Sequence, residues 1–407
     1  MNRMQTPRVI VFAAAIMMMC FGIRLTVGLF TQPLMAEMGL SIASISAAFA
    51  IGQLSWGFFQ PIFGAWTDRG HGFTVLLCGI ACIIGGELLT IVADDIWLLT
   101  LAQGVLAPAG IAAGSLAPLM SIAGKRLPAA QIPVATGIIN SGGSFGQFLF
   151  APLVQFLIQT RGHAASLLAL CGCALAALLP AWGLCRQPEL AVKGTKTGGE
   201  NTGRHAAWRT LRRALGNRDY ALLNAGFFTC GFHVAFLTTH LPGEVLACGH
   251  AASVSATSLS LIGLCNIAGS IGAGILGRHF RMKWILAIVY AARAMMIAMF
   301  MLSAKSELDF YLFSAATGFT WLATVPPTMG IAGKLYGQEN IGTTFGFSFF
   351  IHQIGGFLGA WLGGIAIARL GGLDLVWHID IGLALLAALV NLPIREPPPV
   401  VYAEQAS

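Results

Sequence analysis

Apolar runs of about 20 residues recur along the whole chain, and this pattern constrains the fold more than any other feature. An α-helix rises ~1.5 Å per residue, so about 20 apolar residues cross the ~30 Å hydrocarbon core of a bilayer. Charged residues make up only 10% of the 407 residues, whereas soluble domains average about 25%. The sequence therefore predicts an all-α polytopic membrane protein.

The apolar runs divide the chain into about twelve membrane spans. The spans cover residues 9–35, 42–65, 73–93, 96–121, 132–158, 164–185, 219–241, 252–277, 284–303, 309–333, 341–368 and 375–394. In the long linker after the sixth span, WRTLRRAL is either a short amphipathic helix on the membrane surface or a solvated basic segment. We expect a six-helix bundle over residues 1–187, a cytoplasmic linker over 188–217 and a second six-helix bundle over 218–407.

Lysines and arginines are concentrated on one side of the predicted spans. With a cytoplasmic N-terminus, only Arg161, Lys305 and Arg369 fall in the outside loops. The positive-inside rule then places both termini in the cytoplasm, and we expect a multi-pass membrane protein surrounded by lipid. This distribution explains the net charge of +7 without a nucleic-acid partner.

Motifs for enzymatic or ATP-driven chemistry are absent from the sequence. No G-x-x-x-x-G-K-[ST] phosphate loop and no nucleophile–base pairing stand out. The nine cysteines lie in or beside apolar runs and form no ligand-spaced cluster with histidine, so we interpret them as packing residues. We expect no enzyme activity, no cofactor and no metal.

The two halves of the chain resemble each other at a fixed offset. Gly22 and Gly231 are 209 residues apart, as are Pro33 and Pro242. The segments GIINSGGSFGQFLFAPL (137–153) and GFSFFIHQIGGFLGAWL (346–362) match at several positions at the same offset. A repeat of half the chain length is typical of a duplicated transporter whose substrate binds between the halves.

Arg24 lies near the middle of the first apolar run, in CFGIRLTVGLF. A charge at that depth costs about 2.5–3.5 kcal/mol on insertion scales, so it must be compensated. At the repeat offset Arg24 falls opposite His233, and we expect both side chains to face a shared central cavity. Arg24 could bind a carboxylate through its planar fork, or it could bond structurally to helix carbonyls. His233 could carry a coupling proton or act as a neutral hydrogen-bonding group.

The loop GAWTDRGHG (64–72) resembles the G-x-x-x-D-R-x-G-R loop of the major facilitator superfamily, with Gly64, Asp68 and Arg69 at the key positions of a gating loop. The basic residues that follow in the family are replaced by Phe73 and Thr74, which predicts a weaker charge network. The segments FFTCGFHVAFLTTHLP (227–242) and WLATVPPTMG (321–330) are similar to the bacterial monocarboxylate-porter branch, which includes oxalate/formate exchangers. The resemblance implies two six-helix bundles, transport of small organic anions by alternating access, and a path lined by helices one, four, seven and ten.

Other polar residues in the spans are weaker candidates for the substrate site. Because the third and ninth helices are peripheral in this superfamily, a structural role is favoured for Glu87, while Arg293 stays open between the cavity and a structural partner. Asn140 and His352 lie on repeat-related helices and either bind substrate or bond helix to helix. Trp321 precedes a pair of prolines that should bend the tenth span, and it could form a wall of the site.

These observations together favour a secondary active transporter that moves a small organic anion, a mono- or dicarboxylate, in symport with protons. We expect a functional monomer. An organic anion exchanger is the nearest alternative, because a second anion could neutralise a positive cavity without protons. Efflux or uptake of an amphiphilic or aromatic compound comes next. A non-transporting receptor would not need Arg24 in mid-membrane.

Overall fold

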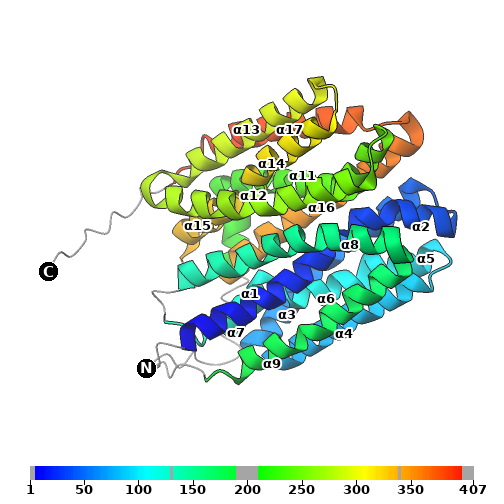
Figure 1. Ribbon diagram of the computed structural model, residues 1–407. Coiled ribbons are helices and arrows are strands. Elements are labelled where there is room, and N and C mark those ends of the chain that lie inside the picture. The colour runs from blue at the N-terminus through cyan, green and yellow to red at the C-terminus, as the bar shows by residue number, and fades with distance from the viewer. Residues whose placement is uncertain (1–4, 129–131, 189–209, 338–340, 397–407) are drawn as a thin grey trace.

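The computed structural model describes residues 5–128, 132–188, 210–337 and 341–396, and within these ranges the chain is helical without strands. Figure 1 shows the helices lying roughly along one direction. In the first half the elements are α1 (Gln5–Arg24), the 3₁₀ helix η1 (Val27–Phe30), α2 (Thr31–Met38), α3 (Ile42–Asp68), α4 (Gly72–Ile91), α5 (Ile96–Leu99), the π-helix η2 (Thr100–Leu106), α6 (Ala107–Ala113), α7 (Leu116–Gly124), α8 (Ile132–Ala176) and α9 (Leu178–Arg186). In the second half they are α11 (Arg218–Ala247), α12 (Ala252–His279), α13 (Met282–Leu302), α14 (Glu307–Thr320), α15 (Val325–Tyr336), α16 (Ile341–Leu370) and α17 (Asp374–Asn391).

Ten helical stretches of the described chain are long and apolar enough to cross a membrane. One of them, Val134–Arg186, has 53 residues and folds back at Gly162, whose φ of 84° and ψ of 168° are not helical. It therefore supplies two spans, and α14 with α15 forms a further, broken one. The twelve predicted spans are accounted for in this way. Of the linker, residues 210–215 are helical, and residues 189–209 lie outside the described part.

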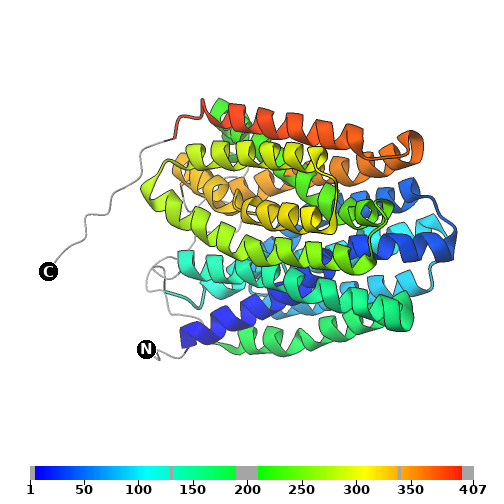
Figure 2. The same ribbon diagram turned by 45° about the horizontal axis from the view of Figure 1, so that its top comes forward.

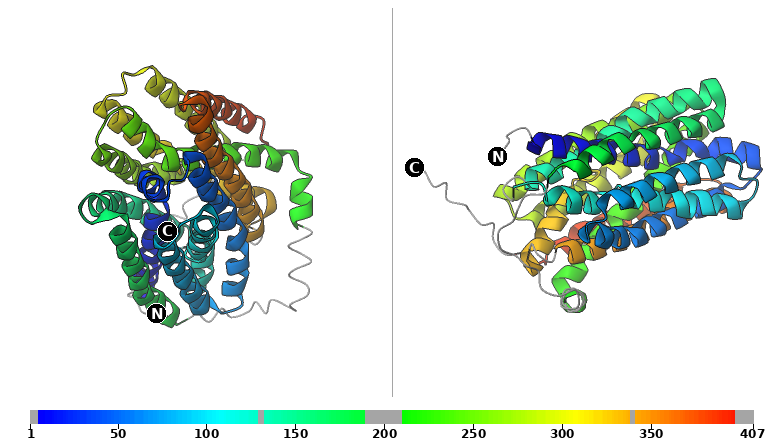
Figure 3. Two further views of the ribbon diagram at one scale, coloured as in Figure 1. Left: turned by 90° about the vertical axis from the view of Figure 1, so that its right-hand side faces the viewer. Right: turned by 90° about the horizontal axis from the view of Figure 1, so that it is seen from below.

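The helices of the two sequence halves form two groups that pack against each other. Viewed from one end, the blue-to-green helices gather on one side and the green-to-red helices on the other (Figure 3). Between the groups, α3 packs on α16 and α8 packs on α12. These two pairs join the second with the eleventh span and the fifth with the eighth, as a two-fold relation between repeats requires. α1 begins and α17 ends at the same end of the bundle, called here the termini end (Figure 2).

Repeat-related glycines allow close helix packing inside each group. A Cβ at Gly146 of α8 would lie 2.1 Å from the carbonyl oxygen of Met18 on α1. A Cβ at Gly355 of α16 would likewise lie 2.0 Å from the carbonyl oxygen of Phe228 on α11. Both contacts exclude every residue except glycine, because the backbone of the neighbouring helix occupies the space. The matching glycines found in the sequence thus have matching structural roles.

The two groups separate toward the termini end. At Gly57 of α3 a Cβ would lie 2.9 Å from Gln353 of α16, but at Gly64, two turns on and on the same face, nothing lies within 4 Å. Across the other pair, a Cβ at Gly263 of α12 would lie 2.7 Å from the carbonyl oxygen of Ser144 on α8, yet Gly274, three turns on, also meets nothing. The contact between the halves is therefore closest in mid-span and toward the opposite end.

Candidate functional site

Four spans of the described chain are interrupted: the sixth at Ala177, between α8 and α9, and three others near their middle. The first span breaks after Arg24, the fourth contains a π-helix and a second break at Gly114 and Ser115, and the tenth breaks between Thr320 and Val325. Each mid-span break leaves backbone amides and carbonyls without helical partners. In a membrane such backbone is tolerated only where protein or a cavity surrounds it, so the breaks mark the candidate site.

Arg24 is the last residue of α1, and its position follows from how the first span breaks. The Thr26 hydroxyl donates to the carbonyl oxygens of Gly22 and Ile23, at 3.0 Å each, and so satisfies the end of the helix. The following turn crosses α11 so closely that a Cβ at Gly28 would lie 2.0 Å from the carbonyl oxygen of Thr238. The guanidinium thus lies at the negative end of the α1 dipole, which stabilises its charge.

The guanidinium of Arg24 is almost completely buried, with 4% of the residue exposed. Its Cζ lies 6.0 Å from the centroid of the Trp56 ring, which favours a cation. The Nη2 atom has no hydrogen-bond partner, although it is inaccessible to solvent. An unpaired buried donor on a charged group is costly. Nε and Nη1 of Arg293 are also unpaired, but Arg24 is the one of the two arginines that lines a cavity, so we take its Nη2 as the indication of a ligand.

Two small adjoining cavities lie beside Arg24. One is lined by Arg24, Glu87 and Gln103 together with Ile23, Val27, Ala107, Pro108 and Ile111. The other contains Glu87, Thr90 and Gln103 and extends to Phe30 and Leu34, with Ile23, Val27, Phe49, Leu167 and Leu170 completing its wall. Each has room for about one water molecule. All lining residues belong to the first half, so the cavities lie within one helix group.

Glu87, for which the sequence favoured a structural role, lies on both cavities. Its Oε2 accepts a hydrogen bond of 3.2 Å from Nε2 of Gln103, which also donates to Thr90 Oγ1 at 2.9 Å. The residue is 3% exposed. α4 is not one of the broken helices. Gln103 of the π-helix η2 bonds to Glu87 of α4 and lines the same cavity as Arg24 of α1. The sequence could not show this, because Glu87 and Arg24 are 63 residues apart.

His233 does not share a cavity with Arg24 in this structure. Its Nδ1 lies 2.6 Å from Oδ2 of Asp380 on α17, and both side chains are 0% exposed. His233 lines neither of the two cavities beside Arg24, and the expectation that both side chains face one central cavity stays a prediction. Asp380 was missed by sequence analysis, although a lone acid in the apolar run 375–394 was an available signal.

Arg293 and Trp321 meet at the break of the tenth span. Nη2 of Arg293 donates to the carbonyl oxygens of Thr320 at 2.6 Å and Trp321 at 3.1 Å. The guanidinium thus satisfies free carbonyl oxygens at the end of α14. This is the structural role that the sequence left open for Arg293 beside a role in the cavity. Trp321 is 0% exposed and packs edge-on against His233, with ring centroids 5.7 Å apart. It borders the His233–Asp380 pair and neither of the two cavities.

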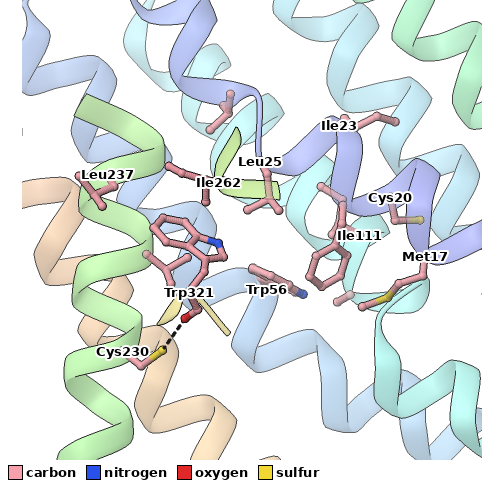
Figure 4. Close-up of a cluster of buried hydrophobic side chains, with 14 of the residues drawn as sticks. Met17, Cys20, Ile23, Leu25, Trp56, Ile111, Cys230, Leu237, Ile262 and Trp321 are labelled. Carbon is pink, nitrogen blue, oxygen red and sulfur yellow. Dashed lines mark hydrogen bonds between the residues drawn. The ribbon is translucent and has the colours of Figure 1, made fainter. Parts of the chain in front are cut away.

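Aromatic rings connect the two halves at mid-span. Trp56 of α3 contacts Phe349 of α16 edge-on, with centroids 5.5 Å apart, and Phe349 stacks on His352 at 5.4 Å. Figure 4 shows Trp56 and Trp321 within the buried cluster between the halves. His352 packs against the rings of Phe349 and Phe227. Asn140, the other polar candidate on a repeat-related helix, lies half-buried on α8 and lines neither cavity.

The loop after α3 is bonded to the end of the fourth span. Oδ1 of Asp68 accepts from the Ser121 hydroxyl at 2.5 Å, and Nζ of Lys125 donates to the carbonyl oxygens of Thr67 and Asp68. In this family, basic residues usually occupy the positions of Phe73 and Thr74. Here the bonds to Ser121 and Lys125, all within the first half, hold the loop instead. Arg69 is exposed, and Gly64 lies on the open face of α3.

A helical membrane protein with repeat-related halves, broken spans and a buried arginine beside a cavity belongs to the class of secondary transporters. The profile of the Major Facilitator Superfamily matches residues 11–360. The chain belongs to this superfamily, which confirms the fold and the family predicted from the sequence.

Several known proteins resemble the chain over most of its length. An uncharacterised MFS-type transporter of Bacillus subtilis, YcxA, is 22% identical over 86% of this chain and 85% of its own. Monocarboxylate transporter 13 of Rattus norvegicus is 25% identical over 84% of this chain and 78% of its own. The oxalate:formate antiporter of Oxalobacter formigenes is 24% identical over 86% and 83%.

A solved structure supports the fold independently. The crystal structure of a bacterial homolog of the human lysosomal transporter Spinster, described as inward-facing and unoccupied, superposes with a TM-score of 0.70. The superposition covers 96% of this chain and 94% of that one at 15% identity. At this identity the likeness concerns the fold alone.

Proposed function

We propose that this protein is a secondary active transporter that moves a small organic anion, a mono- or dicarboxylate, across a bacterial inner membrane by alternating access. The observation that carries the proposal is the buried guanidinium of Arg24, whose Nη2 lacks a partner and lies beside a cavity at the break of the first span. A carboxylate is the ligand that best matches a planar guanidinium fork.

The names of the relatives support the same substrate class. A monocarboxylate transporter and an oxalate:formate antiporter both match over most of this chain. The two helix groups separate toward the termini end and lie close together away from it. This arrangement fits a carrier that is open on one side. With both termini in the cytoplasm, as the distribution of basic residues favours, the open side faces the cytoplasm.

Symport with protons is the form of coupling that we propose, in a chain that works as a monomer. His233 is the residue that the sequence favours as proton carrier, and its contact with Asp380 provides a buried acid–base pair. Exchange of two anions is the alternative, favoured by the likeness to an oxalate:formate antiporter. Exchange needs an internal anion instead of a proton gradient.

The first experiment is uptake by proteoliposomes of radiolabelled lactate, formate, oxalate and succinate, with and without an inward proton gradient. The proposal expects one of these anions to accumulate in wild-type vesicles and uptake to disappear in Arg24→Ala. Uptake that needs only an internal anion would identify an exchanger. Absence of uptake of every carboxylate, by protein that is folded and correctly reconstituted, would contradict the proposed substrate class.

A further inference from the structure

We propose that Glu87 is the proton-carrying group of the Arg24 site, and that its protonation allows the substrate anion to bind the guanidinium. The inference rests on the proposed function and adds the residue that couples the two fluxes. Arg24 and Glu87 line the same cavity from α1 and α4, and both are almost fully buried. They are the two oppositely charged groups on that cavity.

The charge balance of this cavity requires an exchange of partners. With no substrate bound, an ionised Glu87 compensates the charge of Arg24 across the cavity. A substrate carboxylate that binds Arg24 would then place two anions beside one cation in a medium of low dielectric constant, which is strongly unfavourable. Protonation of Glu87 removes this repulsion. Anion and proton therefore bind together, and a monocarboxylate crosses the membrane with no net charge.

The surroundings of Glu87 fit both of its protonation states. When Glu87 is ionised, its Oε2 accepts from Gln103 Nε2, the bond that the structure shows. When it is protonated, its hydroxyl becomes a donor, and a substrate carboxylate bound to Arg24 can accept from it. The other groups that act on Glu87 are the guanidinium of Arg24 from α1 and the thiol of Cys171 from α8. Of these two groups, Arg24 is the one whose positive charge an ionised Glu87 balances.

The second cavity adjoins Glu87 and is not lined by Arg24. It shares Glu87 and Gln103 with the first cavity and extends to Phe30 of η1 and Leu34 of α2, toward the end opposite the termini. In the proposed cycle the proton enters on this side of Glu87. It leaves with the anion when the site opens toward the termini end, and this restores the carboxylate for the next cycle.

The test separates anion binding from proton coupling with the variant Glu87→Gln, which mimics the protonated acid and keeps an acceptor for Gln103. Lactate and oxalate serve as probes, in counterflow without a gradient and in uptake driven by an inward proton gradient. We expect counterflow within about threefold of wild type and a loss of gradient stimulation of about tenfold or more. Glu244→Gln is the matched control: Glu244 lies near the end of α11 and pairs with Lys305, away from both cavities, and we expect this change to leave both activities unchanged.

Two results would overturn the assignment of the proton to Glu87. One is gradient stimulation at the wild-type level in Glu87→Gln. If His233→Gln then loses the gradient stimulation, the proton is assigned to the second half. The other is loss of counterflow together with stimulation in folded Glu87→Gln protein. Infrared difference spectra between acidic and neutral pH give a readout without transport: we expect a carboxylic-acid band that is missing from Glu87→Gln. Its presence in that variant would refute the proposal even if wild-type protein carries neither probe.

Discussion

At the residue scale, the buried titratable side chains discussed above form two clusters, each within one half of the chain. Arg24 lies at the C-terminal end of α1, near Trp56 and across a cavity from Glu87. His233 pairs with Asp380, while Arg293 satisfies the end of α14. A charge in mid-membrane costs several kcal/mol without such partners. Each charged side chain therefore lies where a neighbouring group can compensate its charge.

Replacement of Arg24 by lysine should separate charge from geometry. Arg24→Lys keeps a cation but loses the planar fork, and a hydrogen bond to a charged group is worth about 1.5–3 kcal/mol. We therefore expect carboxylate uptake to fall by roughly 10- to 150-fold, at unchanged melting temperature in detergent. Uptake at the wild-type rate would show that Arg24 does not bind the anion through two hydrogen bonds.

The contact between His233 and Asp380 should appear as coupling in a double-mutant cycle. Each single change, His233→Ala and Asp380→Ala, leaves a buried polar partner unpaired, which costs about 3–5 kcal/mol for a buried ion pair. The double variant should lose less than the sum by about 0.5–3 kcal/mol, measured by unfolding in detergent. The pair Asp380→Ala and Glu244→Ala is the control, expected to add within about 0.5 kcal/mol. Strict additivity in the first cycle would contradict an energetic coupling.

At the element scale, the broken spans and the glycine contacts depend on each other. The breaks in the first, fourth and tenth spans expose backbone groups, and glycines bring neighbouring helices close enough to enclose them. α11, the repeat partner of α1, stays continuous through His233 and packs against the break of the first span at Gly28. The repeat thus uses one broken and one continuous helix at equivalent positions.

Two glycines of α11 provide a matched test of this packing. A Cβ at Gly231 would lie 1.7 Å from the carbonyl oxygen of His352, whereas at Gly243 nothing lies within 4 Å. We expect Gly231→Ala to destabilise by about 1–3 kcal/mol through overpacking, and Gly243→Ala to stabilise by about 0.5–1 kcal/mol through helix propensity. Thermal unfolding in detergent measures both. Equal melting temperatures for the two variants would show that α11 and α16 are not in close contact.

At the scale of the whole molecule, the structure has the shape of one state of a two-state carrier. The halves touch through α3 with α16 and through α8 with α12 in mid-span, and they separate toward the termini end. Alternating access requires these same pairs to close at the termini end when they open at the other. The faces of α3 and α16 that carry Gly64 and Gly346 should then come together.

A bulky side chain at Gly64 should block this closure without affecting the present state. Because nothing lies within 4 Å of its Cβ, Gly64→Leu is expected to change the free energy of unfolding by less than about 0.5 kcal/mol. Transport should fall at least about tenfold, measured as uptake by proteoliposomes. Gly172→Leu, at an exposed position with equally free space, is the control and should transport normally. Normal transport by both variants would contradict closure along this face.

The sequence by itself determined the spans, the repeat and the family, because each depends on residues that are close in the chain or at a fixed offset. Span length follows from bilayer thickness, and the matching glycines record the packing of equivalent helices. Only the tertiary structure decided which charges meet. The pairing of His233 with Asp380 joins residues 147 positions apart, and Glu87 lines the same cavity as Arg24. Helices of similar apolar composition can turn several faces inward, and the choice is made by long-range packing that no local pattern encodes.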